Sequence, residues 1–162
     1  MSLQYIIDSY NMINHPQFRS KAKPSKSIQQ ALHDFIRFNK LTGSVKNTVV
    51  LVFDGYPASN SEICEEEGYT WIFSRKIQAD EEIKKIVEQS AQPRNIIVVT
   101  DDRQVQLTAL VFHANICTVN EFICGKRNNK LKVFTKEDPD NIKLSYSARQ
   151  KINAEFKKRW LA

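Results

Sequence analysis

The stretch Tyr5-Ile6-Ile7-Asp8-Ser9-Tyr10-Asn11 places an aspartate directly after a short apolar run. Such a run is typical of a strand that is buried on both faces of a sheet. Two further segments repeat the arrangement, because residues 49–53 precede Asp54 and residues 96–100 precede Asp101-Asp102. Ligand sites in open α/β sheets form beyond the carboxyl ends of the strands. If the first strand is central in a parallel sheet, these carboxylates lie where such a site would form.

The rest of the pattern alternates strands with helices. Strands are expected at residues 48–53, 69–73, 95–100 and 116–119, and helices at residues 27–41, 80–92, 103–113 and 121–124. Residues 15–25 and the acidic run 65–67 are expected to be loops, and Asp80 is expected to begin its helix. This alternation implies right-handed βαβ units. The predicted fold is therefore a three-layer α/β/α sandwich with a mainly parallel central sheet.

The composition limits the functional classes. A chain of 162 residues that is 41% hydrophobic and 26% charged is of the size of one globular domain. Its three cysteines form no C-x-x-C pair, which argues against a zinc ribbon and a disulfide framework and favours a reducing cytoplasm. No apolar run approaches the roughly 18 residues of a membrane span, and we expect neither a membrane partner nor a signal peptide.

Positive charge is concentrated at the end of the chain. Residues 126–162 hold 11 Lys and Arg against 4 Asp and Glu, whereas residues 1–125 hold 13 against 14. We therefore expect a domain at residues 1–125 and a basic C-terminal extension, with a helix at residues 146–160, that packs on or flanks it. Such a distribution attracts a polyanion, and RNA is the expected partner. The candidate RNA-binding side chains of the extension are Lys126, Arg127, Lys130, Lys132, Arg149, Lys157 and Lys158.

That helix also has a purely structural interpretation. Ile152, Phe156 and Trp160 recur at four-residue spacing, so the helix could pack through this stripe while its charges are merely solvated. Trp160 or Tyr146 could instead stack on an unpaired base.

Each aspartate taken singly has a structural explanation. Asp8 could form an Asx turn, Asp54-Gly55 is a common turn dipeptide, and Asp80 and Asp102 stand where helix N-caps are favoured. Taken together, carboxylates from separate segments at one rim of a sheet repel one another unless cations neutralise them. Mg²⁺ and Mn²⁺ prefer oxygen ligands and are commonly held by one or two carboxylates and a substrate phosphate. Such a site can activate water for in-line phosphoryl displacement without a histidine.

Four blocks of the sequence carry a family resemblance: residues 6–11 with the pattern D-x-Y-N, and residues 52–55, 79–83 and 98–103. In this order they resemble the YacP-like branch of the NYN domains, within the PIN-like nuclease superfamily. The blocks span most of residues 3–124. The resemblance implies a metal-dependent ribonuclease. We expect an endoribonuclease that uses Mg²⁺ or Mn²⁺, in which in-line attack of water on phosphorus leaves 5′-phosphate and 3′-hydroxyl products.

The resemblance also assigns roles to single residues. Asp8, Asp80 and Asp102 fall on the family's acidic cluster, and Asp54 is similar to a further acidic position. Asn11 matches the motif asparagine, which would orient a metal-bound water or the scissile phosphate. Relatives often carry serine where this chain has Asp101, so the choice between Asp101 and Asp102 as a metal ligand stays open at this point.

The neighbours of these residues have supporting roles in this interpretation. Thr100 would orient the adjacent carboxylate, and Ser9 and Glu81 would support the metal-binding side chains. Arg103 would contact a phosphate, although a salt bridge on the helix surface explains it equally well.

Two other functional classes remain as alternatives. One is a non-catalytic RNA-binding module, which could act on ribosome-associated RNA. The other is a phosphotransfer enzyme with an aspartyl nucleophile. The last ranks lowest, because Tyr10 occupies the second acidic position that a D-x-D motif would need.

Overall fold

The computed structural model describes residues 2–57, 64–66 and 68–125. The predictions for residues 126–162, which include the basic extension, its helix and its seven candidate RNA-binding side chains, lie outside the described residues. The proposed boundary between residues 125 and 126 therefore stays a prediction. Within the described ranges, no helix is long and apolar enough to cross a membrane.

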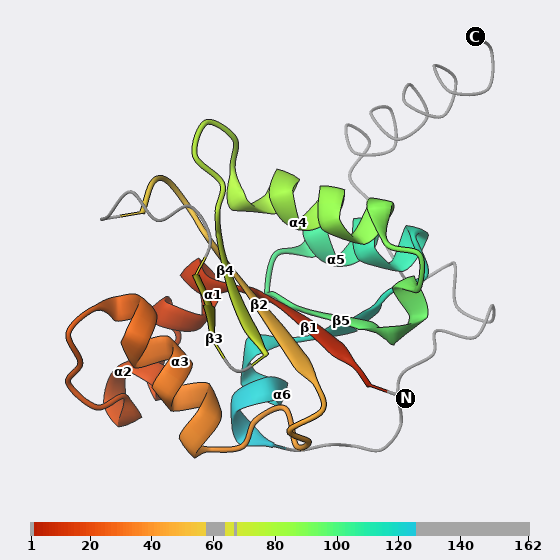
Figure 1. Cartoon of the computed structure of the whole chain (residues 1–162). Coiled ribbons are helices and arrows are strands. Elements are labelled where there is room, and N and C mark those ends of the chain that lie inside the picture. The colour runs from red at the N-terminus through yellow and green to blue at the C-terminus, as the bar shows by residue number, and fades with distance from the viewer. Residues whose placement is uncertain (1, 58–63, 67, 126–162) are drawn as a thin grey trace, which may run out of the picture. The chain divides into compact units, whose positions relative to one another are not determined.

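A six-stranded sheet forms the middle of the fold (Figure 1). Its strands are β1 (Gln4–Asp8), β2 (Thr48–Phe53), β3 (Cys64–Glu66), β4 (Tyr69–Phe73), β5 (Ile96–Val99) and β6 (Asn115–Cys117). The order across the sheet is β3-β4-β2-β1-β5-β6, and only β3 runs antiparallel to its neighbour. The mainly parallel sheet expected from the sequence is confirmed.

Strand β1 is central, as the apolar run predicts. Ile6 pairs with Val50 of β2 on one side and with Val98 of β5 on the other. All three residues are buried. Because all three strands run in the same direction, their carboxyl ends meet at one edge of the sheet.

Helices cover both faces of the sheet. One face carries α4 (Ala79–Gln89) and α5 (Arg103–Val111), and the other carries α1 (Ser9–Asn14), α2 (Pro16–Lys21), α3 (Ile28–Phe38) and α6 (Val119–Cys124), as Figure 1 shows. A short 3-10 turn, η1 (Pro93–Asn95), precedes β5. Each layer has its own apolar core: Ile83 and Val105 pack below one face, and Leu32 and Phe122 pack above the other. The three-layer α/β/α sandwich is confirmed.

The expectation of a loop at residues 15–25 is wrong in its first half. Helix α2 begins after His15, whose Nδ1 accepts a hydrogen bond from the backbone N–H of Gln17 at 3.3 Å. Pro16 occupies the first turn, where its fixed φ and missing N–H suit a helix start. The buried ring of Phe18 then packs edge-on against Phe35 of α3 at 5.2 Å between centroids. A tertiary contact thus stabilises a helix that local composition does not indicate.

The acidic run is also not wholly a loop, because Cys64–Glu66 forms the edge strand β3. Its residues pair with β4 in antiparallel register, from Cys64 opposite Trp71 to Glu66 opposite Tyr69. Pairing of this kind uses backbone groups and tolerates charged residues at a sheet edge. Because this strand is polar, the hydrophobic pattern of the sequence does not indicate it.

Candidate functional site

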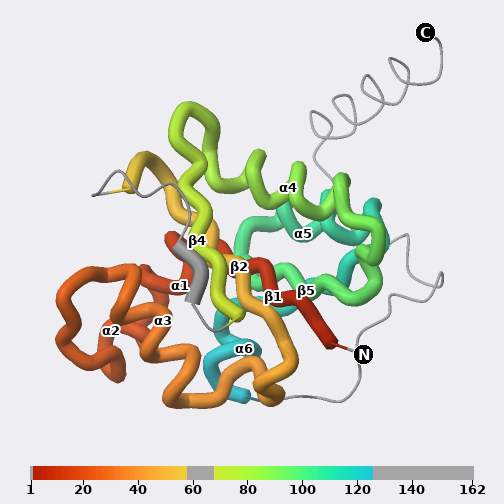
Figure 2. The backbone as a smooth tube through the Cα atoms, viewed as in Figure 1, coloured from red at the N-terminus to blue at the C-terminus, as the bar shows by residue number. Residues whose placement is uncertain are grey.

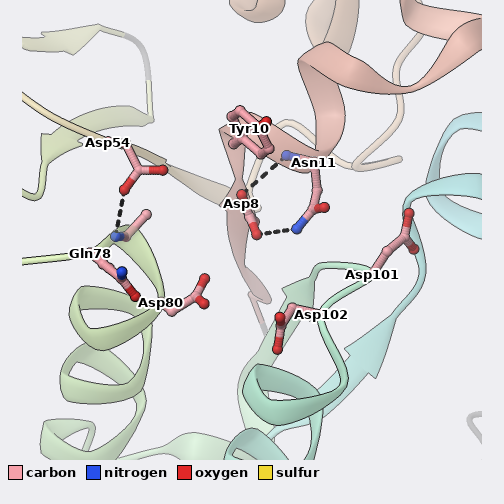
Figure 3. Close-up of a pocket in the computed structure, with 9 residues that line it drawn as sticks. Asp8, Tyr10, Asn11, Asp54, Gln78, Asp80, Asp101 and Asp102 are labelled. Atoms are coloured by element: carbon pink, nitrogen blue, oxygen red, sulfur yellow. Dashed lines mark hydrogen bonds between the residues drawn. The ribbon is translucent and has the colours of Figure 1, made fainter.

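The carboxyl edge of the sheet holds an open pocket of about 560 Å³. Five aspartates line it, and they come from separate parts of the chain (Figure 3). They are Asp8 at the end of β1, Asp54 after β2, Asp80 in α4, and Asp101 and Asp102 after β5. The structure therefore brings together all five aspartates that the sequence singled out, and Asn11 lies with them.

Asp8 is held most tightly of the five. Its side chain is 3% exposed and caps helix α1, accepting a hydrogen bond from the backbone N–H of Asn11 at 3.2 Å. The Oδ2 atom accepts from the Asn11 side-chain amide and from the Thr100 hydroxyl, the latter at 3.1 Å. Burial raises the pKa of Asp8, and the charge of Asp54 adds a smaller effect in the same direction, while the hydrogen bonds oppose it. The structure thus fixes a carboxylate in a place that disfavours its charge.

Thr100 links the carboxyl ends of β1 and β5. Its hydroxyl is fully buried, donates to Asp8, and accepts from the Asn11 amide and from the backbone N–H of Asp102, each at 3.1 Å. The sequence suggested that Thr100 orients the adjacent carboxylate. The carboxylate that it contacts is instead that of Asp8, 92 residues away in the chain.

Asp80 lies one position further into its helix than expected. Helix α4 begins at Ala79, and its N-cap residue is Gln78, which makes no side-chain capping hydrogen bond. Asp80 is therefore not the N-cap that its structural explanation required, and its side chain is directed toward the pocket (Figure 3). Burial raises the pKa of Asp80, and the charges of Asp102, Asp8 and Asp54 raise it further, against a lowering by Lys84.

Asp54 performs the capping that Asp80 does not. Its Oδ1 accepts a hydrogen bond from the backbone N–H of Ala79 at 2.8 Å, as Figure 3 shows. The negative charge also stands at the positive end of the helix dipole. Asp54 thereby ties the end of β2 to the start of α4 and places Asp80 in the pocket.

Asp101 and Asp102 make different contacts. Asp102 caps α5, because its Oδ1 accepts from the backbone N–H groups of Gln104 at 2.7 Å and Val105 at 3.0 Å. Asp101 accepts from the backbone N–H of Val119 at 3.0 Å, and in Figure 3 it is turned toward that side, away from Asp80 and Asp102. This geometry favours Asp102 over Asp101 as the pocket-facing carboxylate.

The supporting residues lie around the pocket but do not line it. Ser9, which follows Asp8 in the chain, is fully buried, and its hydroxyl has no hydrogen-bond partner among the described residues. Glu81 is exposed and forms an ion pair with Lys84 at 2.8 Å. Arg103 begins α5 as an exposed side chain next to Asp102.

Three pocket residues were not predicted from the sequence. Tyr10, Gln78 and Ala79 line the cavity, and Tyr10 is 65% exposed. Tyr10 stands inside the D-x-Y-N block, between Asp8 and Asn11 in the first turn of α1, so the helix start would have indicated it. Gln78 lies in a segment whose composition is typical of a loop. Its place in the pocket follows only from the position of α4, which begins directly after it.

The residues of the pocket fit a hard divalent cation. All five charged groups are oxygen donors, which is the set that Mg²⁺ and Mn²⁺ prefer. The raised pKa of Asp8 and that of Asp80 reflect burial and crowded negative charge, which a cation would relieve. Among the residues that the structure describes, no three His, Cys, Asp or Glu side chains are grouped closely enough to hold an ion by themselves. Mg²⁺ commonly binds through about one or two carboxylates and completes its shell with water and substrate phosphate, so the donor set suits that mode.

Comparison with protein families matches almost the whole chain to one of them. The sequence model of the YacP-like NYN domain matches residues 5–161. No curated protein matches the chain.

Two solved structures share the fold. The crystal structure of Rae1 (YacP) from Bacillus subtilis has a TM-score of 0.51 and 22% sequence identity, covering 98% of this chain and 81% of that chain. The crystal structure of its W164L mutant has a TM-score of 0.54 and 24% identity, covering 77% of this chain and 74% of that chain. At these identities the likeness concerns the fold.

Proposed function

Because this chain belongs to the YacP-like NYN domain family, a PIN-like nuclease-type domain, we propose that it is an endoribonuclease that hydrolyses RNA phosphodiester bonds with Mg²⁺ or Mn²⁺. One observation carries the proposal. Distant segments of the chain deliver five carboxylates to one pocket at the carboxyl edge of the sheet. Asp8, Asp54 and Asp102 accept capping hydrogen bonds, but an uncharged Asn or Ser could accept them as well, so capping does not require five charges in one place. Burial, and then the neighbouring carboxylates, raise the pKa of Asp8 and that of Asp80, and perturbed carboxylates of this kind gather at functional sites.

In this proposal Asp8, Asp80 and Asp102 hold the ion, and Asp54 or Asp101 contributes from the rim. A bound divalent ion would lower the pKa of water and stabilise the oxygen that leaves phosphorus. The protein supplies orientation. The hydrogen bonds from Asn11 and Thr100 fix Asp8 in one rotamer, so little reorganisation is needed when substrate arrives. In-line attack by water then leaves a 5′-phosphate and a 3′-hydroxyl.

Neighbouring residues on α4 provide a matched test. Asp80→Asn removes a pocket carboxylate, whereas Glu81→Gln removes one that pairs with Lys84 at the surface. We expect wild type and Glu81→Gln to cleave a single-stranded RNA in Mn²⁺, and Asp80→Asn and Asp8→Asn to lose at least about 100-fold in rate, which corresponds to about 2.7 kcal/mol of transition-state stabilisation. Thermal unfolding of each variant controls for misfolding. Undiminished cleavage by Asp8→Asn, or cleavage by wild type in excess chelator, would remove the mechanism.

A non-catalytic RNA-binding module is the second candidate. The observation in its favour is that no three potential ligands are grouped to hold a metal among the described residues. RNA binding that persists in chelator, with no cleavage of any RNA offered in Mn²⁺ or Mg²⁺, would support this candidate over the nuclease.

A further inference from the structure

The described fold separates its charges along the chain. Residues 15–47 hold 7 Lys and Arg but only one acidic residue, Asp34. Residues 48–125 hold 6 Lys and Arg against 12 Asp and Glu. The net charge of residues 1–125 is close to zero because a basic segment and an acidic segment cancel one another. The basic segment comprises α2, α3 and their connections.

All seven cations of this segment are exposed, and we call the six that lie outside α3 the basic face: Arg19, Lys21, Lys23, Lys26, Lys40 and Lys46. None of the six forms an ion pair with any residue that the structure describes. Asp34, the acid of this segment, contacts the ring of His33 at 3.2 Å and the amide of Gln30 at 3.0 Å instead.

The lysines of α4 show a contrasting arrangement. Lys84 pairs with Glu81 at 2.8 Å, and Lys85 lies 3.9 Å from Glu82. These pairs neutralise one another on a solvated helix surface. The basic face lacks such partners, so its mutual repulsion is not compensated within the described fold.

An exposed aromatic ring lies within the basic face. Phe38, at the end of α3, is 70% exposed, and the Nζ atom of Lys23 lies 5.5 Å from its ring centroid. This contact joins a side chain of the connection between α2 and α3 to the end of α3, and Figure 2 shows α2 and α3 side by side. An exposed aromatic ring beside a cation is a combination with which proteins bind single-stranded nucleic acid.

Helix α1 connects this face to the acidic pocket. Its first turn contributes Tyr10 and Asn11 to the pocket, and its last residue, Asn14, accepts a hydrogen bond from the guanidinium of Arg19 at 2.5 Å. A helix of 6 residues is only about 9 Å long, so the basic face begins close to the pocket.

We propose that the basic face binds the phosphates of single-stranded RNA next to the segment that enters the acidic pocket. This inference rests on the proposed function and extends it to the substrate. Five aspartates repel a polyanion, so the pocket alone gives RNA little binding free energy until cations neutralise it. Exposed Lys and Arg supply that free energy through phosphate contacts and the release of counterions, without reading the sequence.

Charge reversal on this face provides the test. Lys23→Glu/Lys26→Glu changes two cations of the basic face, and Lys85→Glu/Arg94→Glu makes the same charge change at exposed positions elsewhere. Each variant is assayed with a 20-nucleotide single-stranded RNA and with a trinucleotide that reaches only the pocket. We expect KM for the long RNA to rise at least about tenfold in the first variant, and the slope of log Kd against log salt to fall by about 2. The trinucleotide rate and the control variant should stay near wild type.

Several outcomes would overturn this inference. They are an unchanged KM and salt slope in Lys23→Glu/Lys26→Glu, an equal loss on both substrates, an equal loss in the control variant, and equal affinity for duplex RNA. Failure of the proposed function is recognised separately. If wild type cleaves neither substrate, the Kd and salt slope measured in chelator still decide whether the basic face binds RNA.

Discussion

Asp8 combines deep burial with three hydrogen-bond donors at a single carboxylate. The donors lower its pKa, but burial outweighs them, so the pKa of Asp8 is raised. The pKa of Asp80 is raised as well, first by burial and then by its acidic neighbours. The folded state therefore binds more protons than the unfolded chain between pH 3.8 and the raised values. Without a cation, stability falls as the pH rises through this window and stays lower above it.

This sign gives a prediction for metal binding. Mn²⁺ stabilises the ionised carboxylates, so we expect it to raise Tm near pH 7 and to have little effect near pH 4, close to the ordinary value of 3.8. Asp8→Asn should reduce the shift near pH 7. The measurement is thermal unfolding with Mn²⁺ and with chelator at both pH values. An equal shift at the two pH values, or a full shift in Asp8→Asn, would argue against ion binding at these carboxylates.

At the scale of the element, Asp54 connects β2 to α4. Because Gln78 makes no capping hydrogen bond, the Asp54 carboxylate is the side-chain acceptor for the start of this helix. Loss of a capping acceptor costs about 0.5–2 kcal/mol. We expect Asp54→Ala to lower the free energy of unfolding by about that amount, and Asp54→Asn, which keeps an acceptor oxygen, to stay close to wild type.

Urea unfolding and RNA cleavage measured on the same variants separate the two roles of Asp54. If Asp54→Asn is stable but cleaves slowly, the charge serves the ion as well as the helix. If Asp54→Ala unfolds at the same urea concentration as wild type, the capping role is wrong.

Helices and strands that are stabilised by their own local sequence pattern could be predicted, whereas those that depend on contacts with distant segments could not. Residues 48–53 and 69–73 form strands at the bounds expected, because the first carries the apolar run of a buried parallel strand and the second is rich in aromatic and β-branched residues. Helix α2 depends on the contact of Phe18 with Phe35, and β3 depends on backbone pairing. Neither dependence is visible in a local pattern.

At the scale of the whole molecule, the sequence predicted which carboxylates converge but not how they are held. The strand ends and the family blocks indicated all five aspartates. The hydrogen bond of Thr100 to Asp8 and that of Ala79 to Asp54 join segments that no local rule pairs. The basic segment at residues 15–47 was present in the sequence as well, but averaging the charge over the domain concealed it.

The central claim is that side chains from distant segments of the chain share one divalent ion. The most direct measurement is anomalous diffraction from a crystal of this protein soaked in Mn²⁺. We expect a manganese peak in the pocket, bound directly by one or two of the Asp8, Asp80 and Asp102 carboxylates and through water by the remainder. A pocket without a peak at saturating Mn²⁺, or a peak bound by Asp101 alone, would contradict it.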